Sequence, residues 1–142
     1  MSDEPVGVSV DDDGVAVVTI ANPPINLMTV KVFLTLADTF DGLAADDSVR
    51  AVVIRSGVPG WFIAHFDVEA ILTFPTDQPP PTELNRFHQM CETVRRMPKP
   101  TIAQIEGRVG GGGSELAASC DMRFATSAAV FNQPEVALGI LP

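Results

Sequence analysis

The 142-residue sequence is poor in basic residues, with 9 Lys and Arg against 18 Asp and Glu, a net charge of −9. An acidic chain repels phosphate backbones, so nucleic-acid binding is a poor explanation of its function. No run of about 18 apolar residues occurs, so we expect no membrane partner. The start, from Met1 to Glu4, lacks the basic residues and apolar stretch of a signal peptide. We therefore expect a cytoplasmic protein.

Cysteine is also scarce. Cys91 and Cys120 form no CxxC pair, and no cluster of His and Cys residues of the zinc-binding type lies near them. Both fall in apolar, helix-like patterns. We therefore expect two free, buried thiols and no metal site.

Apolar patterns of strand and helix type alternate along the chain and predict an α/β fold. We expect strands at 15–20, 49–54, 101–105, 122–125 and 130–131, and helices at 29–45, 83–97 and 114–119. On the helix at 83–97, Leu84, Phe87, Cys91 and Val94 share one face. Residues 75–82 hold four prolines and are expected to form an irregular loop, and residues 107–113 a glycine-rich turn.

The glycine run from Gly110 to Gly113 lies between a predicted strand and a predicted helix. Backbone N–H groups at such a helix start are unshielded and bind an anion or a developing oxyanion. A phosphate-binding P-loop would need a lysine where Ser114 and Glu115 follow, and a dinucleotide-binding fingerprint would need glycine where Leu116 stands. A plain structural turn remains the alternative to an oxyanion site.

Two glutamates, Glu115 and Glu135, each follow a predicted strand and have apolar neighbours. Taken alone, Glu115 is equally well explained as a partner of the helix dipole. A pair of carboxylates in apolar surroundings, however, is suited to proton transfer, because desolvation tunes the proton affinity of each. We expect both carboxylates to face one cavity near the glycine run.

Residues 99–125 and 131–142, which contain these glutamates, resemble the two signature motifs of the enoyl-CoA hydratase/isomerase (crotonase) superfamily. Residues 22–26 and 61–67 are similar to two earlier motifs, and the four occur in family order. The resemblance implies a spiral of ββα turns, with 1–142 as a crotonase-like core domain, and assembly as a homotrimer or a dimer of trimers. Family members continue beyond the motif that ends here at Pro142 into C-terminal helices, so we expect a chain that is incomplete at this end.

The resemblance also implies an acyl-CoA thioester substrate, whose CoA replaces any separate cofactor. The backbone N–H groups of Phe66 and Gly112 match the family's oxyanion hole, and we expect them to converge on one point. Glu115 and Glu135 match the catalytic glutamates of family hydratases. The implied substrate-binding positions are Ala64, His65, Asp67 and Gly111. We expect an enoyl-CoA hydratase of fatty acid metabolism. An isomerase or acyl-CoA hydrolase of the same superfamily, or a non-catalytic crotonase-like fragment, is the alternative.

His65 and Phe66 stand where the family usually has small residues. A backbone N–H survives any substitution except proline, so the oxyanion hole is expected to persist. The two bulky side chains are expected to narrow the thioester slot or to favour a particular acyl group. We interpret His65 as a packed or exposed side chain and His88 as a surface residue.

Overall fold

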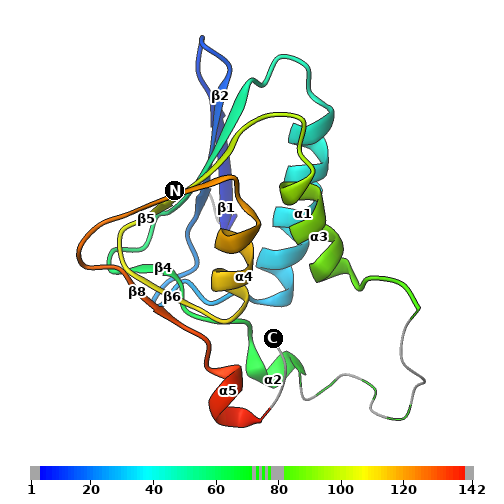
Figure 1. The fold of residues 1–142 in the computed structure, drawn as a ribbon, viewed down its shortest axis with the longest axis vertical. Helices are drawn as coiled ribbons and strands as arrows, with labels where there is room; N and C mark the ends of the chain where they lie inside the picture. The colour runs from blue at the N-terminus through cyan, green and yellow to red at the C-terminus, as the bar shows by residue number, and fades with distance from the viewer. Residues whose placement is uncertain (1–3, 72, 74, 76, 78–81, 140–142) are drawn as a thin grey trace.

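The computed structural model describes residues 4–71, 73, 75, 77 and 82–139, which form four successive ββα units (Figure 1). The first unit contains β1 (Val6–Val10), β2 (Val15–Ile20) and α1 (Val30–Ala45); the second contains β3 (Ala51–Ser56), β4 (Trp61–Ile63), α2 (Val68–Ile71) and α3 (Arg86–Arg95). The third contains β5 (Thr101–Ile105), β6 (Arg108–Gly110) and α4 (Gly112–Ser119); the fourth contains β7 (Met122–Ala125), β8 (Val130–Asn132) and α5 (Glu135–Leu138). The expected α/β spiral of ββα turns is confirmed.

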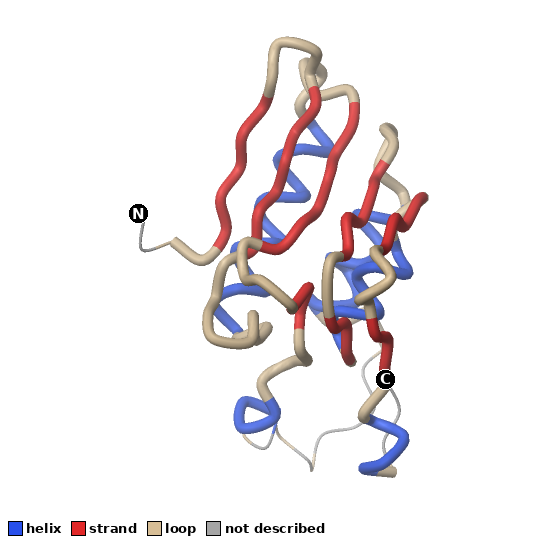
Figure 2. Tube along the Cα trace, turned by 90° about the vertical axis from the view of Figure 1, so that its left-hand side faces the viewer, coloured by secondary structure: helices blue, strands red, loops and turns tan. Residues whose placement is uncertain are grey.

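The larger sheet has the order β1-β2-β3-β5-β7, with β1 antiparallel to β2 and the other neighbours parallel. Its strands are rich in β-branched residues, and every second side chain points toward the helices. Val18, Ile54 and Ala103 stand in register on three adjacent strands and are fully buried. Leu36 and Phe40 of α1 pack into the same core, and Figure 2 shows this helix behind the sheet. The helix-covered face of the sheet is therefore the hydrophobic core.

The smaller sheet takes the second strand of each later unit, in the parallel order β4-β6-β8. Because these strands are parallel, the segments that follow them leave the sheet at the same edge. Residues 64–67 follow β4, Gly111 and α4 follow β6, and residues 133–135 follow β8. Ligand sites of open α/β sheets commonly lie at the carboxyl ends of parallel strands. The topology thus gathers three sequence-predicted segments in one place.

Several predicted boundaries need correction. The second expected strand, at 49–54, spans Ala51–Ser56 in the structure. The expected turn at 107–113 contains a strand, β6, and α4 begins inside the glycine run at Gly112. The short strands β1 and β4 were not predicted. The proline-rich stretch at 75–82 lies mostly outside the described residues.

The predicted buried face of α3 is partly wrong. Leu84 is 54% exposed, whereas Met90 and Val94 are buried, and Phe87 and Cys91 are half-buried. The helix begins later than expected because the Asn85 side chain caps it, accepting a hydrogen bond of 2.9 Å from the His88 N–H. Leu84 therefore precedes the helix and does not share its apolar face.

Both cysteines are free, as expected, with Cys120 buried and Cys91 half-buried. Burial raises the pKa of the Cys91 thiol to about 11 and that of Cys120 to about 12. Within the described part of the chain, no group of three or more His, Cys, Asp or Glu residues is placed to hold a metal ion. None of its helices is long and apolar enough to cross a membrane.

Candidate active site

The segment after β4 is held in place by Met28. The Met28 N–H donates to the His65 carbonyl, and the Asp67 N–H donates to the Met28 carbonyl, each over 3.0 Å. In such a parallel pairing, the residue between the two bonded ones, here Phe66, turns its own N–H and C=O away from the partner strand. No atom of the described residues accepts a hydrogen bond from the Phe66 N–H. This N–H is available to a ligand on the side of the segment away from Met28.

Asn26 fixes the approach of this segment and was not identified from the sequence as functional. Its side chain is fully buried, and its Nδ2 donates to the carbonyls of Ile20 and Phe62 and to the Ser56 hydroxyl. Its Oδ1 accepts from the Asn22 N–H over 2.8 Å. One buried amide thus joins the ends of β2, β3 and β4. In the sequence, only the Asn-Pro-Pro-Ile-Asn motif at residues 22–26 drew attention to Asn26.

The glycine run lies directly beside this segment. Gly111 has φ +48°, and a Cβ there would lie 2.6 Å from Oε1 of Glu135 and 3.5 Å from Cβ of His65. Gly110 approaches the Ala64 carbonyl so closely that it has no room for a side chain. Glycine is therefore required for the backbone to pass between residues 64–65 and Glu135.

Gly112 is the first residue of α4, so its N–H has no acceptor within the helix. No described residue outside the helix accepts from it either. A Cβ at this position would lie 3.6 Å from the Met28 sulfur, and Met28 is the residue that pairs with Phe66. The two predicted oxyanion donors, Phe66 and Gly112, are therefore both neighbours of Met28. Their convergence on a single ligand atom stays a prediction.

Glu115 lies in the first turn of α4 with a half-buried side chain. Its Oε1 accepts a hydrogen bond of 3.3 Å from Nε2 of Gln133. Burial raises the pKa of the Glu115 carboxyl above its ordinary value of 4.5, and the negative charge of Glu135 raises it further. The nearby His88 and the Gln133 hydrogen bond act in the opposite direction on this pKa. Glu115 thus holds its proton more tightly than an exposed glutamate.

Glu135 begins α5, three residues after β8, and its Oε1 lies over Gly111. Its Oε2 is buried and has no hydrogen-bond partner among the described residues. A buried carboxylate oxygen without a partner is costly, so such an atom is normally completed by a proton, a water molecule or a ligand. The electrostatic effect of Glu135 on Glu115 shows that the structure brings the two carboxylates together beside the glycine run.

The remaining predicted site residues have mainly local contacts. Nδ1 of His65 lies 2.7 Å from the Phe66 carbonyl oxygen. The Asp67 carboxylate accepts from the Glu69 N–H over 3.1 Å and so begins α2. His65 is half-buried, and His88 is exposed as expected. A hollow between Ser56 and Trp61 is lined by none of the candidate residues.

Comparisons with known proteins agree with this architecture. The family model for enoyl-CoA hydratase/isomerase matches residues 11–142. Over 131 residues the chain is 35% identical to the probable enoyl-CoA hydratase of Bacillus subtilis (strain 168), covering 92% of this chain and 50% of that protein. It is 34% identical over 135 residues to the glyoxysomal fatty acid beta-oxidation multifunctional protein MFP-a of Cucumis sativus, covering 94% of this chain and 18% of that protein.

A solved structure extends the likeness to the fold. The enoyl-CoA hydratase of Mycobacterium smegmatis superposes with a TM-score of 0.85 at 28% identity, covering 96% of this chain and 53% of that one. The chain therefore spans about half the length of the single-function relatives it matches, and less of the multifunctional one. From the family match, the order of its motifs and its ββα spiral, the chain belongs to the enoyl-CoA hydratase/isomerase (crotonase) family.

Proposed function

We propose that this chain supplies the catalytic residues of an enoyl-CoA hydratase, which adds water across the α,β double bond of an enoyl-CoA thioester. The observation that carries the proposal is the buried, unpartnered Oε2 of Glu135 beside Glu115, whose own pKa is raised. A carboxyl group that holds its proton tightly, with a second glutamate nearby, is suited to proton transfer. A purely structural pair would satisfy both carboxylates with hydrogen bonds.

The first step depends on the backbone N–H groups of Phe66 and Gly112. When a nucleophile adds at Cβ, negative charge develops on the thioester oxygen. Two fixed N–H dipoles stabilise that charge without reorganising, and one such donor is worth about 3–4 kcal/mol. Both N–H groups lack an acceptor among the described residues, and both residues are neighbours of Met28.

The second step is proton transfer by the glutamate pair. One carboxylate accepts a proton from the water that attacks Cβ, and the pair delivers a proton to Cα. Burial and the negative charge of Glu135 favour the protonated form of Glu115, so Glu115 is suited to hold the proton that is delivered. The Gln133 amide orients the Glu115 carboxylate from the β8 side.

The presence of two carboxylates favours hydration over the other reactions of the family. Isomerisation moves a proton between two carbon atoms and needs one acid/base group, whereas hydration must also activate a water molecule. An acyl-CoA hydrolase would release free CoA. The products therefore separate the three reactions.

The test is to incubate the intact protein with crotonyl-CoA and follow the loss of the conjugated thioester absorbance. Glu115→Gln and Glu135→Gln should each lower the hydration rate by roughly 10²–10⁴, the usual worth of a positioned acid or base. Glutamine keeps the shape of the side chain, so circular dichroism and CoA binding should be retained.

Glu106→Gln is the matched control, because Glu106 is exposed and lies outside the site. It should hydrate crotonyl-CoA at the wild-type rate. Wild-type hydration by both site variants would refute the assignment, and so would release of free thiol or a shifted double bond as the main outcome.

A further inference from the structure

The aromatic ring of Phe87 lies next to Gly112. A Cβ on Gly112 would be 3.2 Å from Cζ and 3.4 Å from Cε2 of that ring. In a helix the Cα–Cβ bond tilts toward the N-terminal end, which is also the direction in which the Gly112 N–H points. The ring therefore borders the space in front of the candidate oxyanion donor. Phe87 is only half-buried, so part of its side chain is open to solvent.

Two neighbouring phenylalanines hold the ring in place. Its centroid is 6.1 Å from that of Phe33 and 6.1 Å from that of Phe66, with both pairs edge to face. Phe33 and Phe66 are themselves 5.9 Å apart. The expectation that Phe66 would narrow the thioester slot thus needs refinement. Its ring supports Phe87, and Phe87 is the ring that reaches Gly112.

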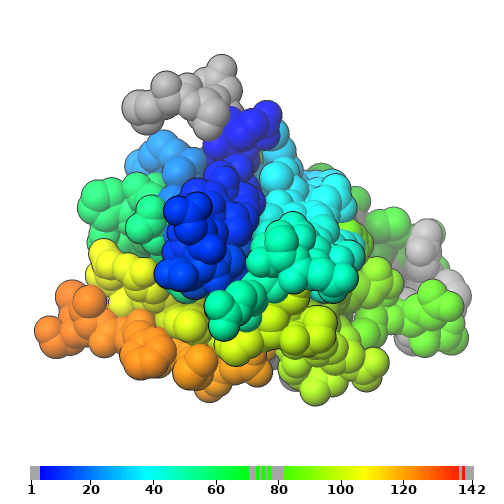
Figure 3. All heavy atoms as spheres, turned by 90° about the horizontal axis from the view of Figure 1, so that it is seen from above, coloured from blue at the N-terminus to red at the C-terminus, as the bar shows by residue number. Residues whose placement is uncertain are grey.

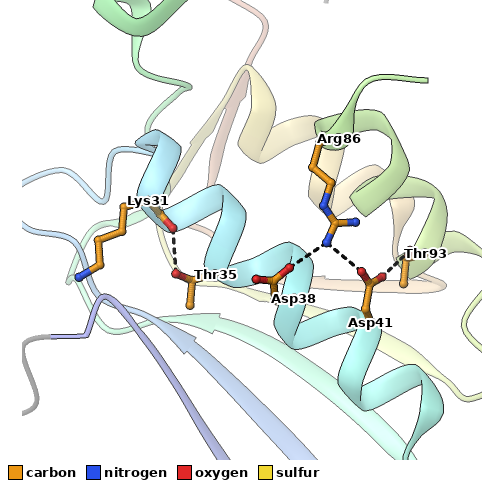
Figure 4. Close-up of polar contacts among 6 residues, drawn as sticks. All are labelled: Lys31, Thr35, Asp38, Asp41, Arg86 and Thr93. Atoms are coloured by element: carbon orange, nitrogen blue, oxygen red, sulfur yellow. Dashed lines mark hydrogen bonds and ion pairs between the residues drawn. The ribbon is translucent and has the colours of Figure 1, made fainter. Parts of the chain in front are cut away.

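The start of α3 is also anchored to α1, as Figure 4 shows. Nη2 of Arg86 lies 2.9 Å from Asp38 and 2.8 Å from Asp41, and the Thr93 hydroxyl donates to Asp41 over 3.1 Å. Each exposed ion pair contributes little to stability alone. Together with the Asn85 cap, however, they orient the helical turn that carries Phe87. The helical turn that carries Phe87 is thus tied to α1.

We propose that Phe87 is the specificity-determining residue of this site and restricts it to enoyl thioesters that carry no substituent on the α-carbon. The inference rests on the proposed hydratase function. A thioester whose oxygen is bound at Gly112 places its α-carbon one bond from the carbonyl carbon, close to the ring. A methyl group on that carbon must share the space that the ring fills, and one such group typically changes specificity 10–200-fold, or about 1–3 kcal/mol.

The test compares kcat/KM for crotonyl-CoA and for its 2-methyl analogue in the intact protein. The wild-type enzyme should prefer crotonyl-CoA, and Phe87→Leu should raise the relative kcat/KM of the 2-methyl substrate by about tenfold or more. Phe124→Leu is the matched control, because it makes the same change in an exposed ring on β7, outside this aromatic cluster. It should leave the ratio at the wild-type value.

A paired substitution tests the contact itself. Gly112→Ala pushes against Phe87 and should lower kcat/KM, and the loss should be smaller in the Phe87→Leu background, where the ring is gone. An unchanged substrate ratio in an active Phe87→Leu variant, or an equal loss in both backgrounds, would overturn the role of Phe87 alone. Absence of any hydration by the wild-type protein would instead refute the proposed function.

Discussion

The helix α4 and the segment formed by β7, β8 and α5 differ in how deeply their side chains are buried. Leu116 and Ala117 of α4 are buried, whereas every residue of β7 and β8 is exposed. The exposed side chains include Phe124 at 63%, Phe131 at 52% and Val136 at 77%. In Figure 3 the orange atoms of β7 and the turn after it lie at the outer edge of the molecule.

One candidate glutamate lies in each of these two regions. Glu115 is carried by a helix that the core holds, so packing fixes its position. Glu135 follows β8, which is tied to the glycine run by hydrogen bonds to the Asn132 carbonyl from the Gly111 N–H, over 3.3 Å, and from the Ser114 hydroxyl, over 3.1 Å. One half of the proposed acid/base pair thus depends on apolar burial and the other on a few polar contacts.

The largest expected difference between the regions is the cost of removing an aromatic ring. Phe40→Ala, in the fully buried core, should lower the free energy of unfolding by about 3–5 kcal/mol. Phe124→Ala should change it by no more than about 0.5 kcal/mol, because that ring is mostly exposed. Urea denaturation of both variants measures the difference, and equal losses would show that β7 is packed more tightly than the structure indicates.

The contact between α4 and β4 should be the next most sensitive. A Cβ on Gly113 would lie 2.6 Å from Cβ and 2.9 Å from the carbonyl oxygen of Ile63, so Gly113→Ala should cost about 1–3 kcal/mol. Gly42, in the interior of α1, has no described atom within 4 Å of the added Cβ. Gly42→Ala should therefore stabilise the protein by about 0.5–1 kcal/mol. If thermal denaturation gives both changes the same sign, the close approach of α4 to β4 is wrong.

Removing the hydrogen bond between Ser114 and β8 should lower the stability less, and only locally. Ser114→Ala removes the hydroxyl donor to Asn132 and should cost about 0.5–1.5 kcal/mol. Amide hydrogen exchange should speed up in residues 130–136 and stay unchanged in β3. Ser119→Ala is the control, because the Ser119 hydroxyl donates to the Glu115 carbonyl and not to β8. Faster exchange near Asn132 in the control variant would contradict the local role of Ser114.

The smallest expected effect concerns pH. The raised pKa of Glu115 means that the folded state binds its proton more tightly than the unfolded chain does. Its contribution to stability is therefore complete below about 4.5 and is lost as pH rises through the folded-state pKa. Glu115→Gln should accordingly raise Tm relative to wild type more at pH 7 than at pH 4. A gain that is equal at both values would show that the carboxyl is not desolvated.

Sequence patterns predicted the elements of the core well. The bounds expected for β2 and β5 agree with the structure, because runs of β-branched and apolar residues form central strands. The bounds expected for β7, an exposed edge strand, also agree. The strands of the small sheet were harder to predict. β4 and β6 have three residues each, and β6 ends in glycine, so neither shows a periodicity. Their pairing depends on contacts between units distant in sequence.

The candidate site shows a similar division. Both glutamates and the glycine run stood out because carboxylates and consecutive glycines in apolar surroundings are unusual. Asn26 and Phe87 did not stand out, since an asparagine in a turn and a phenylalanine on a helix have ordinary structural explanations. Their importance follows from burial and from the distance to Gly112, which only three-dimensional structure provides.

The repetition of ββα units has a consequence for how such a site can change. Each of the last three units contributes one short segment to the site, placed just beyond a strand of the small sheet. The strands keep their register through backbone hydrogen bonds, which do not depend on side-chain identity in the segments that follow. In the proposed enzyme, a substitution in one segment is therefore expected to alter substrate preference while the other two segments keep their geometry.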